Sequence, residues 1–172
     1  MINLLGISHS FQIRVFKPPL EGGLLDFNIP LACRFETYLE NLVKEIRPEA
    51  ICEEYSDTKI REHQEIDDKV YSIPKKICGD HALMHIFCDP DICERSRLYS
   101  AYGTTAEEDE KNGHPVRERE WLRRIAPLLP HTSILFICGA DHVATFGQKL
   151  KENGFAVEVI SQNLEETWKL GC

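Results

Sequence analysis

Short runs of apolar residues alternate along this chain with segments whose apolar residues recur every three or four positions. Runs of four to eight apolar residues are typical of buried strands, and the three-to-four spacing is typical of amphipathic helices. The pattern predicts strands over residues 2–8, 50–55, 83–88, 134–137 and 155–160.

Helices are predicted between these strands. The clearest cover residues 31–46, 116–129 and the segment that follows Gly139. A thinner apolar stripe predicts helices over 59–71, with Asp57 as its N-cap, and over 91–99, with Ile92 and Leu98 facing inward.

Loops are predicted for two segments of the chain. Residues 11–30 contain Pro-Pro and Gly-Gly pairs and predict a long loop, which is either a lid or a plain surface connection. Residues 102–115 are acidic and predict a solvated loop or a mobile insertion.

The alternation of strands and helices predicts an α/β fold with a central, mainly parallel sheet flanked by helices. The length of 172 residues suits a single domain over residues 1–172. The order of the strands does not follow from one sequence.

The bulk chemistry narrows the choice of partners and compartment. A net charge of −8 disfavours nucleic acid and anionic membrane surfaces, and no apolar run is long enough to span a bilayer. Seven cysteines without a CxxC pair and the absence of a signal-peptide pattern favour free thiols in a reducing cytoplasm. The expected partner is a small-molecule or peptide substrate, and the oligomeric state does not follow from the sequence.

Two predicted strands end in the same motif, Gly-x-x-His, with Gly6 leading to His9 and Gly139 leading to His142. The carboxyl ends of parallel strands form the ligand crevice of open α/β sheets, and glycine permits a tight turn there. The two imidazoles are therefore expected at one edge of the sheet, as metal ligands or general bases. The alternative for either histidine alone is a loop residue that bonds a neighbouring carbonyl group.

Adjacent carboxylates, Glu53 and Glu54, end a third strand. Successive strand residues point to opposite faces, so only one of them is expected to face the crevice, and Glu54 does so if it shares a face with Cys52. Either could complete a His/His/Glu metal set or act as a base, and the alternative is a solvated strand end.

Arginines and one more carboxylate extend this candidate site. Arg117 or Arg119 could pair with Glu54 or bind a substrate oxygen, although a solvent-facing helix start is the alternative for either. Asp89 ends the strand over 83–88 and could bind a metal or the substrate, or cap the next helix.

Taken in order, these motifs resemble the TraB/PrgY and TIKI superfamily, with its erythromycin-esterase-like and ChaN-like relatives. The resemblance is carried by the Gly-x-x-His motifs at 6–9 and 139–142, the strand-end glutamate within 48–55, and the Arg-Glu-x-x-Trp helix start at 117–121. It spans nearly the whole chain, and it implies an α/β fold of the esterase-like or ChaN-like kind.

The resemblance implies site residues and a reaction class. The family positions fall on His9, His142, Glu54 (with Glu53 one step away) and Arg117. Gly6 and Gly139 of the motifs are expected near a bound group, as is Asp89 from its place at the end of a strand. It implies a hydrolase of ester or peptide bonds that uses a divalent metal ion (manganese, cobalt or zinc) or a metal-free histidine–glutamate base. The alternative is a non-catalytic module that binds haem or another ligand through the same histidines. The chain is shorter than the larger members, and its sequence shows no signal-peptide pattern or membrane-spanning run, so their secreted or tethered roles are not expected for it.

Overall fold

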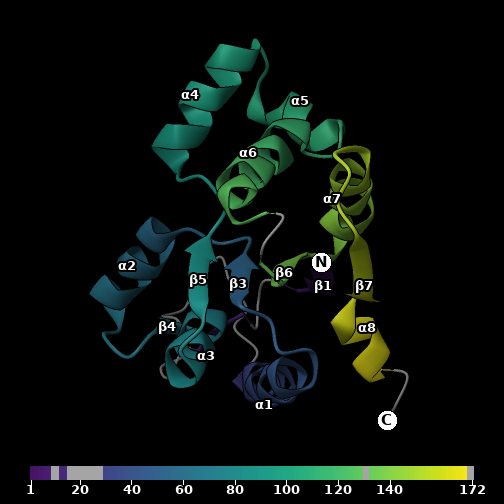
Figure 1. Cartoon of the computed structure of the whole chain (residues 1–172). Coiled ribbons are helices and arrows are strands. Elements are labelled where there is room, and N and C mark those ends of the chain that lie inside the picture. The colour runs from purple at the N-terminus through teal and green to yellow at the C-terminus, as the bar shows by residue number, and fades with distance from the viewer. Residues whose placement is uncertain (9–11, 15–28, 130–131, 170–172) are drawn as a thin grey trace.

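The structure is a computed structural model that describes residues 1–8, 12–14, 29–129 and 132–169. Within these residues, five strands form one central sheet in the order β5-β3-β6-β1-β7 (Figure 1). Its strands are β1 (Ile2–Ile7), β3 (Ala50–Glu53), β5 (Met84–Phe87), β6 (Ile134–Gly139) and β7 (Val157–Ser161). All neighbouring pairs are parallel, which confirms the predicted α/β fold.

The three central strands end at nearly the same level. Ile7 of β1 is aligned with Gly139 of β6, and Ile137 of β6 is aligned with Glu53 of β3. Every residue of these three strands is buried, as expected for strands covered by helices on both faces. The residues that follow β1, β3 and β6 therefore lie at one edge.

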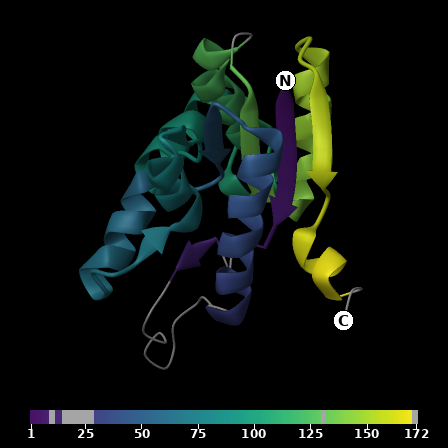
Figure 2. The ribbon, with the colours of Figure 1, turned by 60° about the horizontal axis from the view of Figure 1, so that its bottom comes forward.

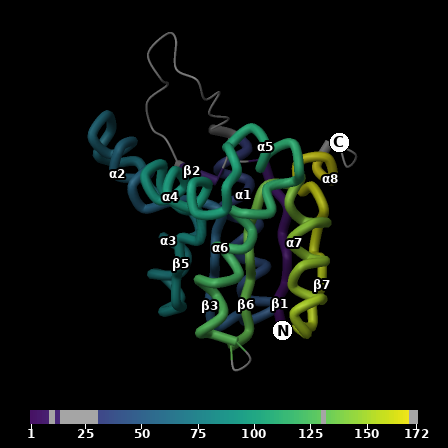
Figure 3. The backbone as a smooth tube through the Cα atoms, turned by 90° about the horizontal axis from the view of Figure 1, so that it is seen from above, coloured from purple at the N-terminus to yellow at the C-terminus, as the bar shows by residue number. Residues whose placement is uncertain are grey.

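Helices cover both faces of the sheet (Figures 2 and 3). One face packs against α1 (Ile29–Ile46), α3 (Ile73–His81) and α8 (Leu164–Lys169), and the other against α6 (Pro115–Ile125) and α7 (Ala140–Glu152). Phe35 and Leu39 of α1 are fully buried on the first face, and Trp121 and Phe146 on the second. The sheet thus separates two apolar layers.

The remaining elements lie at the periphery of these layers. They are α2 (Asp57–Ile66), α4 (Ile92–Tyr102), α5 (Ala106–Lys111), a 3₁₀ turn (Ala126–Leu128), and the two-stranded antiparallel sheet of β2 (Ile13–Arg14) and β4 (Tyr71–Ser72). In the described ranges, no helix is both long enough and apolar enough to cross a bilayer.

The segment from 57 to 81 differs from the prediction. α2 ends at Ile66 instead of continuing to residue 71, and the side chain of Ser56, not Asp57, caps its first turn. The chain then forms β4 and α3, which were not predicted. α3 has only nine residues with Pro74 in its first turn, so its short apolar stripe gives little periodic signal.

The segment over 102–115 and the helix α4 also differ from the prediction. The predicted loop over 102–115 contains α5, which begins with a capping box between Thr105 and Glu108 and buries Asp109. α4 has no buried residue, and Ile92, which was expected to face inward, is 78% exposed. α4 packs mainly against α6 and extends away from the sheet, so its apolar positions find no partner layer (Figure 1).

Other predictions have mixed outcomes. Gly154 follows α7 with a φ of 83°, a left-handed conformation that glycine adopts readily, and β7 lies at one edge of the sheet. The described cysteines are free, and Cys52, Cys78, Cys88 and Cys138 are buried. His9 and most of the predicted loop over 11–30, including its possible role as a lid, lie outside the described residues.

Candidate functional site

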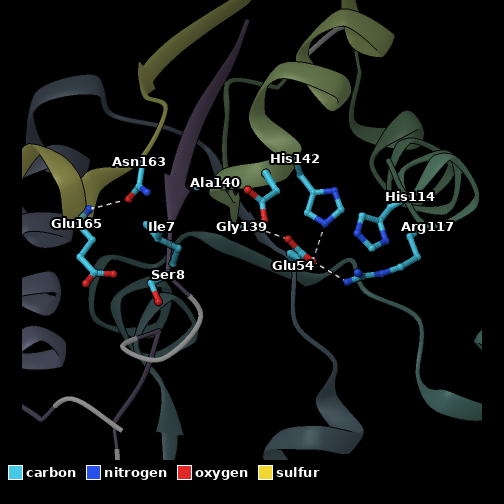
Figure 4. Close-up of a pocket in the computed structure, with 11 residues that line it drawn as sticks. Ile7, Ser8, Glu54, His114, Arg117, Gly139, Ala140, His142, Asn163 and Glu165 are labelled. Atoms are coloured by element: carbon cyan, nitrogen blue, oxygen red, sulfur yellow. Dashed lines mark hydrogen bonds and ion pairs between the residues drawn. The ribbon is translucent and has the colours of Figure 1, made fainter. Parts of the chain in front are cut away.

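A cavity of about 440 Å³ opens at the carboxyl edge of the central strands (Figure 4). It lies beyond the ends of β1 and β6, between the first turns of α6 and α7 on one side and the segment after β7 on the other. Its walls are formed by Ile7, Ser8, Glu54, His114, Arg117, Gly139, Ala140, Asp141, His142, Asn163 and Glu165. This is the position at which open α/β sheets bind ligands.

Glu54 lies at the centre of this cavity wall. Its backbone N–H donates to Ile137 O (2.8 Å), which continues the sheet pairing one residue past β3. Its carboxylate is 3% exposed, and Oε2 accepts a hydrogen bond from Gly139 N (2.7 Å). Oε1 lies 2.6 Å from Arg117 Nη2 and 3.3 Å from His142 Nε2 (Figure 4). The predicted shared face of Cys52 and Glu54 is confirmed, because Cys52 packs in the core layer of α6 and α7.

Glu53 points to the opposite face, as the alternation of strand side chains requires. It is fully buried and accepts hydrogen bonds from Gln12 Nε2 and Ser72 Oγ, and its Oε1 lies 2.7 Å from His85 Nε2. Glu53 is therefore separated by the sheet from the cavity that contains Glu54. The two carboxylates therefore cannot bind the same metal ion in this arrangement.

Arg117, in the first turn of α6, is held by two carboxylates. Besides Glu54, it contacts Asp89 Oδ1 through Nε (3.1 Å) and Nη2 (3.0 Å). Burial alone lowers the pKa of Arg117, but the charges of Asp89 and Glu54 outweigh burial and raise the pKa. Within the described part of the chain, Arg117 Nη1 donates no hydrogen bond. Arg117 also lines the cavity.

Asp89 positions Arg117 and does not line the cavity. Its carboxylate also pairs with Arg95 and accepts a hydrogen bond from Trp121 Nε1 (3.3 Å). The expected alternative, that Asp89 caps the next helix, is wrong, because Asp91 supplies the capping box of α4. Arg119 is exposed on α6, with its guanidinium 4.5 Å from the centre of the Tyr102 ring, so Arg117 is the arginine at the site.

His142 was expected in the turn between β6 and the next helix, but it lies in the first turn of that helix, α7. It is 4% exposed, and its Nε2 and Nδ1 lie 3.3 Å from carboxylate oxygens of Glu54 and Glu118, respectively. Burial favours the neutral ring, but the contacts with Glu118 and Glu54 prevail and raise the pKa of His142 to about 9. At neutral pH this side chain is therefore an imidazolium that donates to two carboxylates.

Glu118 belongs to the Arg-Glu-x-x-Trp helix start but was not predicted as a site residue. Its Oε1 accepts from Thr145 Oγ1, and its Oε2 lies 2.8 Å from Lys149 Nζ. Burial raises its pKa, but hydrogen bonds from His142, Lys149 and Thr145 dominate and lower it. A glutamate that follows an arginine on a charged helix resembles an ordinary surface residue in the sequence.

The two glycines of the Gly-x-x-His motifs have roles other than the tight turns expected of them. Gly6 lies inside β1, where a Cβ atom would come within 2.0 Å of the carbonyl oxygen of Gln162, so a close backbone approach excludes any side chain. Gly139 has a φ of −57°, which any residue adopts, and contributes its N–H to Glu54. Gly6 does not line the cavity, whereas Gly139 does.

His114 is a residue of the cavity wall that was not predicted from the sequence. The centre of its ring lies 4.6 Å from that of His142, and it lines the cavity beside Arg117 (Figure 4). The available signal is its place three residues before Arg117, directly ahead of the proline that begins α6. His9 lies outside the described residues, so its place relative to the cavity stays a prediction.

The described residues do not fit a divalent metal ion as they are arranged. Both ring nitrogens of His142 face carboxylates, and Glu54 already accepts from Arg117 and Gly139. Among the residues that the structure describes, no group of three or more histidine, cysteine, aspartate or glutamate side chains has a geometry suited to a metal. The donor set instead forms an ion-pair cluster, which can orient a substrate and stabilise charge.

Comparison of the chain with protein-family models, with curated proteins and with solved structures found no match.

Proposed function

We propose that this protein is a hydrolase that cleaves an ester or amide bond in the cavity at the carboxyl edge of its sheet. The observation that carries the proposal is the buried cluster of His142, Glu54 and Arg117 in the cavity wall. Burying charges is unfavourable unless they are paired, so buried ion-pair clusters in cavities are candidates for functional sites.

The cluster offers donors where an acyl-transfer reaction develops negative charge. Arg117 supplies Nη1, and the first N–H groups of α7, which lie at the cavity, have no partner within their helix. Such preorganised donors stabilise the oxyanion of a tetrahedral intermediate. Glu54 fixes both Arg117 and the start of α7, so one carboxylate sets the geometry of both groups of donors.

His142 does not fit the role of a base and instead supplies a fixed positive charge. Its ring carries the proton at neutral pH, with its nitrogens aimed at Glu54 and Glu118. A charged imidazolium beside the reacting carbonyl adds to the electrostatic stabilisation of the oxyanion. We therefore favour the metal-free form of the proposed mechanism.

The resemblance to the TraB/PrgY and TIKI superfamily supports this proposal through the order of its motifs, and the kinship itself stays a prediction. The metal-dependent form and the haem-binding alternative both need a free histidine nitrogen. His142 offers none in the described arrangement. His9, the other histidine that these alternatives use, lies outside the described residues, so both alternatives stay predictions.

Hydrolysis of a small panel tests the proposal. p-Nitrophenyl acetate, p-nitrophenyl butyrate and alanine p-nitroanilide are assayed with the wild type, His142→Gln and the control Arg119→Ala, before and after dialysis against a chelator. We expect turnover by the wild type, a loss of about 100-fold in kcat/KM for His142→Gln, and little change for Arg119→Ala.

Two results would contradict the proposal. One is the absence of turnover on every substrate, and the other is full activity of a folded His142→Gln protein. Metal analysis of the purified protein, with loss of turnover after chelation, would favour the metal-dependent form instead.

A further inference from the structure

We propose that His114 is the general base of this site, the group that removes a proton from the attacking water. This role rests on the proposed hydrolase function and adds to it the residue that the Glu54, Arg117 and His142 cluster lacks. The sequence motifs do not include His114, and its position in the fold carries the inference.

The first step is the absence of another free base in the cluster. The carboxylate of Glu54 accepts from Gly139, Arg117 and His142. His142 has both ring nitrogens against carboxylates. By contrast, no residue in the described ranges hydrogen-bonds to the ring nitrogens of His114, whose ring contact is the tilted packing against His142. One ring nitrogen of a neutral imidazole is then a free acceptor at the cavity wall.

The second step is the backbone that delivers this ring. His114 has φ 57° and ψ 41°, a left-handed conformation that costs a non-glycine residue about 1–2 kcal/mol. Its N–H donates to Asp109 O (2.6 Å), while Asp109 Oδ1 accepts from Val116 N (2.8 Å). Pro115 then begins α6. A strained residue that its neighbours hold in place on both sides is typical of functional sites.

The third step is electrostatic. Burial, the charge of His142 and the charge of Arg117 lower the pKa of His114, and Asp109 and Glu54 oppose them with smaller effects. These groups come from α7, α6, α5 and the residue that directly follows β3. The ring is therefore neutral at pH 7, as a base must be before it accepts a proton.

The chemistry balances without any further reactant. The water oxygen forms a bond to the carbonyl carbon as His114 takes its proton, and the carbonyl oxygen becomes an oxyanion beside Arg117 Nη1. When the bond to the leaving oxygen breaks, that oxygen takes the proton from the His114 imidazolium. Ester and water give acid and alcohol, and His114 is neutral again.

The test uses His114→Asn and His114→Gly on p-nitrophenyl acetate. Asparagine and glycine both adopt left-handed backbone, so both variants can keep the α6 start intact. We expect kcat to fall by about 100-fold or more in both, with KM changed by no more than about threefold. Added imidazole should restore turnover in His114→Gly beyond the rate of imidazole alone, and His81→Asn, on the opposite face of the sheet, should behave as wild type.

The pH profile gives a second readout. The wild-type kcat/KM should decline on the acidic side with an apparent pKa below 6.5, and this limb should disappear in His114→Asn. A folded His114→Asn protein with wild-type kcat and an unchanged acidic limb would overturn the role of His114, while a loss in His142→Gln alone would leave the hydrolase proposal standing. A wild type without any turnover would overturn both.

Discussion

At the scale of single residues, the direction of a side chain decides which candidates form the site. The alternation of strand side chains predicted that only one of Glu53 and Glu54 faces the crevice, and the structure identifies Glu54. For Arg117 and Arg119 the residue pattern alone left both open, because it does not show which side of the helix faces the sheet, and the choice of Arg117 came from the resemblance. His114 was out of reach of sequence reasoning, because its placement depends on a left-handed backbone and on the buried carboxylate of Asp109.

Replacement of Arg117 by alanine should destabilise the protein. Glu54 and Asp89 would remain buried without their shared cation, and breaking such a pair costs about 3–5 kcal/mol. Urea unfolding followed by circular dichroism measures the change. The matched control is Arg119→Ala, which removes an exposed contact with Tyr102 and should change the free energy of unfolding by at most about 1 kcal/mol. Equal free energies of unfolding for the two variants would show that Arg117 does not stabilise the buried carboxylates of Glu54 and Asp89.

His142 should make the free energy of unfolding fall as the pH rises into the alkaline range. Its pKa is raised to about 9 in the folded protein, above the ordinary 6.5. The stabilisation of about 3 kcal/mol is therefore complete below pH 6.5 and is lost as pH rises through 9. The difference in free energy of unfolding between wild type and His142→Gln, measured from pH 6 to pH 10, should shrink by about this amount. A constant difference would show that His142 is not held as an imidazolium.

At the scale of elements, the apolar periodicity predicted long helices and buried strands well and short or peripheral elements poorly. α1 and the strands β1, β3, β5 and β6 lie within one or two residues of their predicted bounds. α3 and α5 were missed because six to nine residues give too few turns for a period to emerge, and because capping and packing stabilise them more than an apolar stripe does.

Replacement of glycine by alanine should have opposite effects on stability at Gly6 and at Gly79. Gly6→Ala should destabilise the protein by about 3 kcal/mol or more, because the new methyl group overlaps the backbone of Gln162 directly after β7, and a backbone group cannot move aside as the end of a flexible side chain can. Gly79→Ala, inside α3 with nothing within 4 Å, should instead stabilise it by about 0.5–1 kcal/mol. Thermal denaturation of the two variants should therefore shift in opposite directions.

At the scale of the whole molecule, the class of fold followed from the sequence and the order of strands did not. Alternating strands and helices sufficed for a parallel sheet with helices on both faces. The order β5-β3-β6-β1-β7 depends on pairings between residues far apart in the chain, such as Ile2 with Ile134, about which local patterns carry no information. That order brings Glu54, Arg117 and His142 together, so the site could be predicted as a set of residues but not as a geometry.

The two apolar layers should unfold together. Phe35 lies on one face of the sheet and Phe146 on the other, both fully buried, and replacement of either by alanine should cost about 3–5 kcal/mol. Since both layers share the same strands, each variant should still show one transition that coincides in tryptophan fluorescence and circular dichroism. Ile92→Ala, on exposed α4, should change stability by no more than about 0.5 kcal/mol.

The central position of β1 has a consequence for synthesis on the ribosome. This strand lies between β6 and β7, so its two neighbours are made long after it. Until they emerge, its apolar residues have no sheet to join and are exposed to chaperones and to other nascent chains. β1 is thus translated before the other strands of its sheet and is among the last of them to be buried, and the cavity beside it forms only after β6 and β7 have emerged.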